Sequence, residues 1–401
     1  RVCLVQSFGR RCNPMAISSK RITINLLLIA AVASIPIIEK FVPLGLHISD
    51  PMTDVFVYAI LGLGLNVLTG FTGLLNLGVA AFAAIGAYVF AISTCEIYPF
   101  QLGFWSALGL TMAAGALAGF ALGAPTLRVR GDYLAIVTLG FGEIVKDVLV
   151  NMDSITKGTQ GINPLPPPTL FGHELGGSGQ YWLFMVIALL VAVGARSLER
   201  SRIGRGWISI REDELASRAM GIRPDHAKML AFATCASLAA LAGALTASRL
   251  SSSGEPGNYD FQISILALCI VIVGGIGSVR GVLLGALVMV GMNSIVLVKL
   301  TELMGGSDAA PPSALAEAHG LQWVFLFVKT WAQNVLISPT NWKFLVFGLA
   351  LVLMMIFRPE GILPARGAKE DAPDGDEGPG GVAGGVTGGG ASSVAAKELR
   401  P

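Results

Sequence analysis

The chain has 401 residues, of which 53% are hydrophobic and only 13% are charged, and its mean hydropathy is +0.67. A soluble domain carries about 25% charged residues, so this sequence has too few polar side chains to coat a water-soluble body of its length. The net charge of +2 gives no electrostatic support for nucleic-acid binding. The composition therefore predicts an integral membrane protein.

Residues 1–21 precede the first apolar stretch, and we expect them to form a cytoplasmic leader. Met15 begins a segment typical of a membrane-protein N-terminus, because Lys20 and Arg21 stand directly before the apolar residues 22–38. The same order occurs in signal peptides, and the small residues near position 31 resemble a cleavage site. The stretch is long for a signal peptide and just long enough to cross a bilayer, so we favour an uncleaved first helix.

Nine further apolar segments follow the first. They lie at about 55–70, 74–94, 102–123, 133–150, 182–198, 227–248, 263–273, 282–300 and 343–357. Several are shorter than the roughly 20 residues that cross a bilayer, and 263–273 ends at the small-residue break 274–281. Such interruptions occur where protein or a water-filled cavity satisfies the backbone, and they point to a transport pathway. We predict an all-α polytopic bundle of about ten transmembrane or half-membrane helices across residues 22–365.

The basic residues predict the orientation of these segments. The loop at about 199–226 carries six arginines, whereas the loop 95–101 has neither lysine nor arginine. With ten segments, the positive-inside rule places both termini in the cytoplasm. The stretches 151–181 and 301–342 then lie on the opposite side. The charged, Gly-rich tail 366–401 is expected to be disordered.

The chain lacks the motifs of the common enzyme classes. It contains no GxxxxGK[ST], GxSxG or HExxH motif, and its cysteines and histidines have no metal-ligand spacing. We therefore expect no enzyme activity, no metal site and no cofactor in this chain, and any energy for transport must come from elsewhere.

One group of polar residues lies in the fifth segment. Glu143, Asp147 and Asn151 share a helix face, and an acid inside a membrane is by default a functional candidate. The alternative is that Glu143 forms an ion pair with Lys146 one turn further along and only holds neighbouring helices together.

A second group lies at 64–78, where neutral polar side chains alternate with glycines. A neutral site suits a zwitterionic or amide-like solute better than a metal ion, although the Ala/Gly run up to Gly86 also suits helix packing. From both groups, the candidates for the translocation path are Asn66, Thr72, Asn76, Asp132, Thr138 and Glu143. The glycines expected at helix breaks are Gly70, Gly73, Gly274, Gly275 and Gly277.

The third feature is the loop 201–222. Ile210, Glu214, Arg218 and Ile222 recur at every fourth position, which predicts a short amphipathic helix that ends at Gly221. A helix this short is steadied by docking onto a partner, or else it packs as a solvated loop helix under its own bundle.

In these segments the sequence resembles the LivM-type permease subunits of branched-chain amino acid ABC importers. The matching stretches occur in the family's order and cover the chain from about 55 to 364. They are 66–78, 130–144, 156–162, 204–222, 274–286 and 357–364. The resemblance implies a bacterial inner-membrane complex with a homologous second permease, two cytoplasmic subunits that bind ATP and Mg²⁺, and a periplasmic substrate-binding protein.

The resemblance also implies a role for the 199–226 loop. In ABC importers a Glu-x-Ala…Gly loop forms a coupling helix that docks on the ATPase, and Glu214, Ala216 and Gly221 match that pattern. The residues expected to form the coupling loop are Arg211, Glu212, Asp213, Glu214, Ala216 and Gly221. Two alternatives stay open: a permease of a urea or short-chain amide importer, and a self-sufficient secondary transporter that uses Glu143 and Asp147.

Overall fold

The computed structural model describes residues 32–36, 39, 49–99, 101–126, 132–170, 173–292, 294, 343–358 and 361–363. The predicted leader, most of the first predicted segment, the stretch 301–342 and the predicted tail lie outside the described residues. The chain divides into two units at 365/366, and every described residue belongs to the first.

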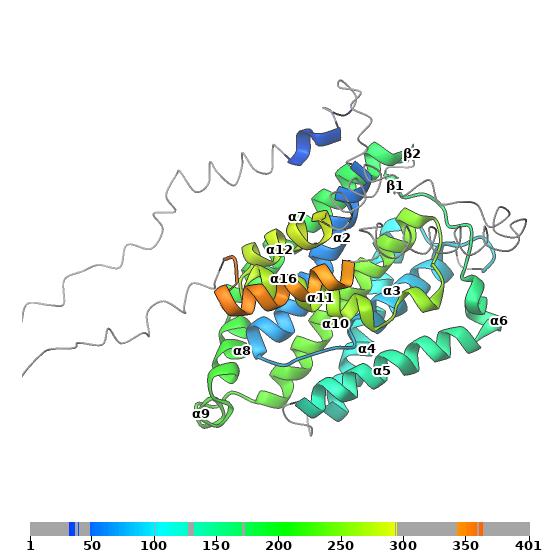
Figure 1. Cartoon of the computed structure of the whole chain (residues 1–401). Helices are drawn as coiled ribbons and strands as arrows, with labels where there is room; N and C mark the ends of the chain where they lie inside the picture. Colours follow the sequence, from blue (N-terminus) through cyan, green and yellow to red (C-terminus); the bar gives the residue numbers. More distant parts are fainter. Residues whose placement is uncertain are drawn as a thin grey trace, which may run out of the picture. The chain divides into compact units, whose positions relative to one another are not determined.

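The described residues form an all-α polytopic fold, as predicted (Figure 1). The helices are α2 (Ser49–Leu65), the π-helix η1 (Asn66–Phe71), α3 (Val79–Thr94), α4 (Phe104–Thr126), α5 (Asp132–Asn151), α6 (Asp153–Thr156), η2 (Gly158–Gln160), α7 (Gly177–Arg200), α8 (Arg202–Glu212), α9 (Glu214–Ala219), α10 (Pro224–Leu250), η3 (Pro256–Asn258), α11 (Phe261–Gly274), α12 (Val279–Gly291) and α16 (Lys343–Phe357). The strands β1 (Thr169–Leu170) and β2 (His173–Glu174) form a small antiparallel pair.

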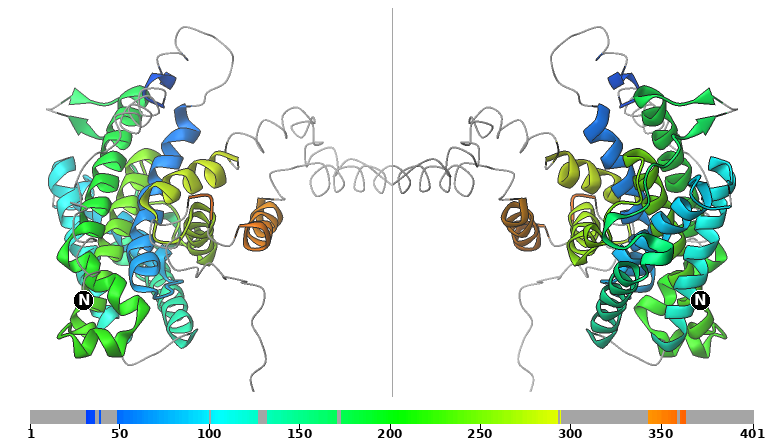
Figure 2. Two further views of the ribbon diagram at one scale, coloured as in Figure 1. Left: turned by 90° about the vertical axis from the view of Figure 1, so that its left-hand side faces the viewer. Right: turned by 90° about the vertical axis from the view of Figure 1, so that its right-hand side faces the viewer.

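Among the described residues, five helical stretches are long and apolar enough to cross a membrane. They are Ser49–Phe71, Phe104–Pro125, Gly177–Arg200, Pro224–Leu250 and Pro256–Gly274. Each apolar segment predicted from residue 55 onwards overlaps at least one of the described helices. Figures 1 and 2 place α8 and α9 at one end of the spanning helices and the β1–β2 pair at the other end. The 199–226 loop and the 151–181 stretch therefore lie on opposite sides of the bundle, as the sequence predicts.

Helix α10 packs against α2, α3 and α4 because small side chains let the backbones approach closely. A Cβ atom added to Gly86 of α3 would lie 2.1 Å from the carbonyl oxygen of Ala240, and one added to Gly243 would lie 1.9 Å from that of Ala83. The Ala/Gly run that ends at Gly86 therefore serves helix packing, which was one of its two interpretations.

Helices α11 and α12 form a hairpin whose turn pairs with residues 362–363. The turn contains Gly275 and Gly277, which both have positive φ angles. Beyond α16, the backbone N–H groups of Ile362 and Leu363 donate to the carbonyls of Val273 and Gly274, at 3.0 and 3.1 Å. These bonds satisfy two carbonyls at the end of α11, where no helical partner remains.

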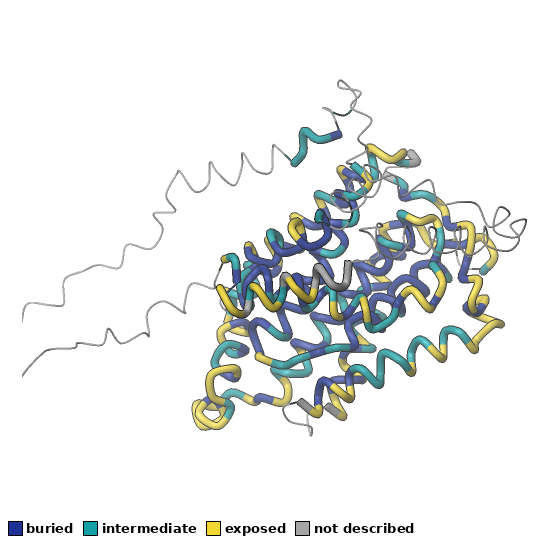
Figure 3. The backbone as a smooth tube through the Cα atoms, viewed as in Figure 1, coloured by how far each residue is buried: buried dark blue, intermediate teal, exposed yellow. Residues whose placement is uncertain are grey.

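The two sides of the described bundle differ in polarity. Over their central turns, α4 and α7 expose large apolar side chains such as Leu117, Phe120 and Leu190. In contrast, α5 is largely exposed or half-exposed along its length and carries charged side chains (Figure 3). The first surface is suited to contact with lipid. The second combines exposed apolar side chains such as Ile136 and Ile144 with charged ones, and the charged part is not suited to lipid.

Candidate functional site

The spanning stretch Ser49–Phe71 is followed directly by a break in the helical structure. Helix α2 continues into η1, after which residues 73–78 are not helical and α3 begins only at Val79. The hydroxyl of Thr72 donates to the carbonyl of Leu68 at 2.5 Å, and Gly73 follows with a φ angle of +73°. The predicted start of the segment 74–94 is therefore wrong, because the helix begins only at Val79. The glycines and the polar side chains, which compete for backbone hydrogen bonds, open a loop there.

The break lies against the turn of the α11–α12 hairpin. Oδ1 of the buried Asn66 accepts a hydrogen bond of 2.8 Å from the backbone N–H of Gly277. A Cβ atom on Gly70 would lie 2.3 Å from that same oxygen and 2.8 Å from the nitrogen of Gly277. Glycine at position 70 is therefore required for this contact, and the two groups of predicted helix-break glycines meet here.

Helix α5 holds the other side of the break. The hydroxyl of Thr138 accepts from the N–H of Leu77 at 3.0 Å and donates to the carbonyl of Ala135 at 3.0 Å. The side chain of Asn76 is fully buried, and its Oδ1 accepts from the N–H of Gly78 at 2.9 Å. Its Nδ2 has no hydrogen-bond partner among the described residues, and the Asn76 amide interacts with the thiol of Cys235. These polar groups therefore mainly hold the backbone of the break in place.

The acidic candidates lie apart from this cluster. Asp132 is the first residue of α5, and its side chain lies outside the described part of the structure. Glu143 forms an ion pair with Lys146, as the alternative interpretation proposed. Because both residues lie on α5, this pair does not connect two helices. Among the described residues, no hydrogen bond or ion pair joins Glu143 to the break.

The loop between α7 and α10 contains two helices instead of the single short amphipathic helix predicted within 201–222. Helix α8 ends at Glu212, and Asp213 adopts an extended conformation with a φ angle of −151°. Its Oδ1 accepts hydrogen bonds from the N–H groups of Leu215 and Ala216, at 2.7 and 3.0 Å, and caps α9. The prediction missed this internal cap. The predicted end at Gly221 is confirmed, because that residue follows α9 with a φ angle of +86°.

Both short helices are fixed to the start of α10. The indole N–H of the buried Trp207 donates to the carbonyl of Ala227 at 2.7 Å. Nζ of Lys228 lies 2.7 Å from Oε2 of Glu214. Trp207 was not among the predicted site residues, although a single tryptophan in an arginine-rich loop was a usable signal.

Helix α8 also reaches the helix break directly. Nη1 of Arg211 donates a hydrogen bond of 2.6 Å to the carbonyl of Gly70, and its Cγ lies 3.0 Å from where a Cβ of Gly73 would be. In contrast, Leu215 on α9 and Met220 directly after it are 75% and 83% exposed. One side of the loop is therefore bonded to the membrane-spanning helices. At its other side, Leu215 and Met220 form an apolar surface that no described residue covers.

Comparisons with known proteins identify the family. A family model described as the permease component of branched-chain amino acid transport systems matches residues 47–355. The chain belongs to this family. The high-affinity branched-chain amino acid permease LivM of Salmonella typhimurium is 38% identical over 339 residues, which cover 79% of this chain and 69% of that protein. The LivM protein of Escherichia coli K12 gives the same values.

A probable LivM of Methanocaldococcus jannaschii is 23% identical, over 77% of this chain and 91% of that relative. No solved structure matches the chain. The expected resemblance to LivM-type permeases is therefore confirmed. With its apolar helices, this permease is a multi-pass membrane protein of an amino-acid ABC transport family.

Proposed function

We propose that this chain forms half of the translocation pathway of an ATP-driven importer for branched-chain amino acids. It would lie in the bacterial inner membrane with both termini in the cytoplasm, as the arginine-rich loop favours. Its partners would be a homologous second permease, two cytoplasmic ATP-binding subunits and a periplasmic substrate-binding protein. ATP and Mg²⁺ would bind to the ATPase subunits, and this chain would hydrolyse nothing.

The observation that carries this proposal is the two-sided loop of α8 and α9. The exposed Leu215 and Met220 offer an apolar surface on which an ATPase subunit would dock. The hydroxyls of Ser209 and Ser217 lie 2.6 Å apart, so α9 is tied to α8 as well as to α10. A displacement of α9 would therefore move α8, and Arg211 would carry that movement to the helix break at Gly70.

The charged side chains on α5 support the proposal of a second permease subunit. Glu143 and Lys146 are 44% and 25% exposed, and Asp147 is exposed on the same helix. Charged side chains inside a bilayer are costly and face protein or a water-filled cavity. We therefore expect this surface to be covered by the second permease or to line the aqueous path between the two.

The test is reconstitution of the affinity-purified chain with the subunits that accompany it. We expect two ATPase subunits and a second permease to be recovered, and ATP-dependent uptake of radiolabelled leucine once the binding protein is added. Uptake of urea without leucine uptake would contradict the proposed substrate. Uptake by the chain alone, driven by an ion gradient without ATP, would favour the secondary-transporter alternative and overturn the proposal.

A further inference from the structure

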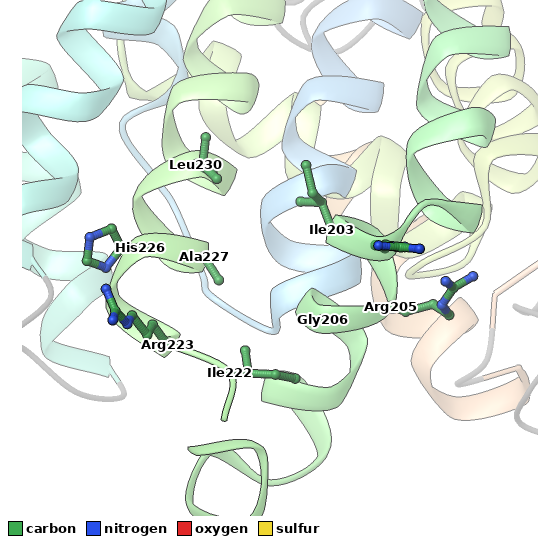
Figure 4. Close-up of a pocket in the computed structure, with 9 residues that line it drawn as sticks. Ile203, Arg205, Gly206, Ile222, Arg223, His226, Ala227 and Leu230 are labelled. Atoms are coloured by element: carbon green, nitrogen blue, oxygen red, sulfur yellow. The ribbon is translucent and has the colours of Figure 1, made fainter. Parts of the chain in front are cut away.

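A cavity of about 450 Å³ lies between the first turns of α8 and α10. It is lined by Arg202, Ile203, Arg205, Gly206, Ile222, Arg223, His226, Ala227 and Leu230 (Figure 4). Because α7 ends at Arg200 and α10 begins at Pro224, the cavity lies where two spanning helices meet the membrane surface. The contacts of Trp207, Ser209, Arg211 and Glu214 do not involve its side chains. Of the lining side chains, Arg205 donates a hydrogen bond of 3.0 Å from Nη1 to the carbonyl of Arg200.

The polar part of the cavity is strongly basic. Arg202, Arg205 and Arg223 line it together with His226, and none of the described residues that line it is acidic. Within the described part of the chain, none of the three arginines forms an ion pair. In Figure 4, Arg223 and His226 lie at one side of the space and Arg205 at the other. Long flexible arginine side chains on both sides are suited to bind an anionic group at the mouth.

The remaining wall is apolar and continues into the membrane. Ile203 and Leu230 are 48% and 50% exposed. One turn beyond Leu230, Thr234 lies on the same face of α10 and lines a second cavity of about 520 Å³, together with residues of α4 and α7. This second cavity is lined mainly by apolar side chains, and it opens on the surface where α4 and α7 expose large hydrophobic residues.

We infer that the basic cavity binds the headgroup of an anionic phospholipid, with an acyl chain lying along Leu230 toward the second cavity. Clusters of basic residues at the ends of membrane helices attract anionic lipids, and each contributes about 1 kcal/mol near the surface. A soluble anion would use the arginines but would leave the apolar wall uncovered. The inference rests on the proposed function only in assigning the site to the cytoplasmic leaflet.

The site lies close to the moving parts of the proposed mechanism. Trp207, which fixes α8 to Ala227, directly follows Gly206 of the cavity. A bound lipid would therefore brace the junction of α8 with α10 from the membrane side, and lipid composition would influence how firmly the loop is held.

The test is native mass spectrometry of the purified full chain with the subunits that accompany it. The probes are phosphatidylglycerol and phosphatidylcholine with identical acyl chains. We expect preferential retention of phosphatidylglycerol, and the variant Arg202→Gln/Arg205→Gln/Arg223→Gln should bind it about fivefold more weakly for each charge removed. The control Arg280→Gln removes an exposed charge from the first turn of α12, outside the cavity, and should leave lipid retention unchanged.

A second variant tests the apolar wall. Leu230→Gln should weaken binding of a long-chain phosphatidylglycerol but not of glycerol phosphate, which has no acyl chain. Equal retention of both phospholipids by the unmodified protein would overturn the inference, as would a triple variant that retains phosphatidylglycerol like the control. If the triple variant loses its ATPase subunits while its lipid retention is unchanged, the cavity docks protein and the inference is wrong. Failure of leucine uptake with lipid preference intact would instead count against the proposed function alone.

Discussion

The guanidinium of Arg211 donates a hydrogen bond of 2.6 Å to the carbonyl of Gly70, although the two residues lie far apart in the sequence. Gly70 lies at the end of the π-helix η1, where carbonyl groups have lost their helical partners and carry partial negative charge. One arginine therefore stabilises the helix end and joins the 199–226 loop to the break in the spanning stretch.

We expect Arg211→Ala to weaken the coupling between ATP hydrolysis and uptake. Because the bond is only partly buried, it contributes about 1 kcal/mol, and uptake per ATP hydrolysed should fall by roughly fivefold. The measurement is leucine uptake and ATPase activity in the same vesicles. Arg280→Ala makes the same charge change elsewhere and should leave the ratio intact. If both variants lower the ratio equally, Arg211 has no specific role.

Gly221→Val should also uncouple hydrolysis from uptake without removing the chain from the membrane. No atom lies within 4 Å of a Cβ at this position, so the cost comes only from the positive φ angle and amounts to about 1–2 kcal/mol for an L-residue. Asparagine tolerates this conformation better, and Gly221→Asn should recover much of the coupling. Unchanged transport by the valine variant would contradict a coupling role for this turn.

Gly86→Val should destabilise the bundle. Its side chain would meet the backbone of Ala240, and overpacking of this kind costs about 1–3 kcal/mol. The expected result is a lower apparent Tm of the detergent-solubilised chain, followed by size-exclusion chromatography after heating. Gly109→Val on α4 is the matched control, since nothing lies within 4 Å of a Cβ there. Equal Tm values for both variants would argue against close packing of α3 on α10.

The ion pair on α5 predicts a non-additive result. Removing one partner, as in Glu143→Gln or Lys146→Met, leaves an unpaired charge in the membrane region and should lower leucine uptake strongly. The double variant removes both charges and should retain more activity than either single variant. A double variant as inactive as Glu143→Gln would instead indicate that the carboxylate acts on the solute or on an ion.

The predicted orientation is tested with a reporter fused after Ala365. Cytoplasmic β-galactosidase activity and an absence of alkaline phosphatase activity are expected, because the basic loops are retained on the inner side. The same fusion within the 151–181 stretch should give the reverse pattern. A periplasmic signal after Ala365 would contradict the ten-segment topology.

Much of the fold followed from the sequence because long apolar segments have few alternatives in a bilayer. Helices α4, α7 and α10 match their predicted segments closely. The boundaries were wrong where polar and glycine residues compete with helical hydrogen bonds. The predicted start at 74 falls in the loop beside Gly73, and the cap at Asp213 divides the 199–226 loop into two helices.

The candidate site could be predicted only as a list of residue types. Sequence spacing identified Asn66, Gly70 and Gly277 separately, but their contact depends on the α11–α12 turn reaching α2. The hydrogen bond from Arg211 to Gly70 could not be predicted either. A helical repeat indicates which residues share a face but not which backbone carbonyl lies opposite. Tertiary packing supplied that information.

The hydrogen bonds from Ile362 and Leu363 to the α11–α12 turn also set an order for biosynthesis. The ribosome completes this hairpin well before it reaches the segment that follows α16. In the nascent chain, the carbonyls of Val273 and Gly274 must therefore be hydrated or held by an insertion factor until that segment arrives. Translation arrested before Gly361 should leave an inserted hairpin whose Val273 and Gly274 carbonyls lack these hydrogen bonds. We expect membrane proteases to degrade such a truncated chain.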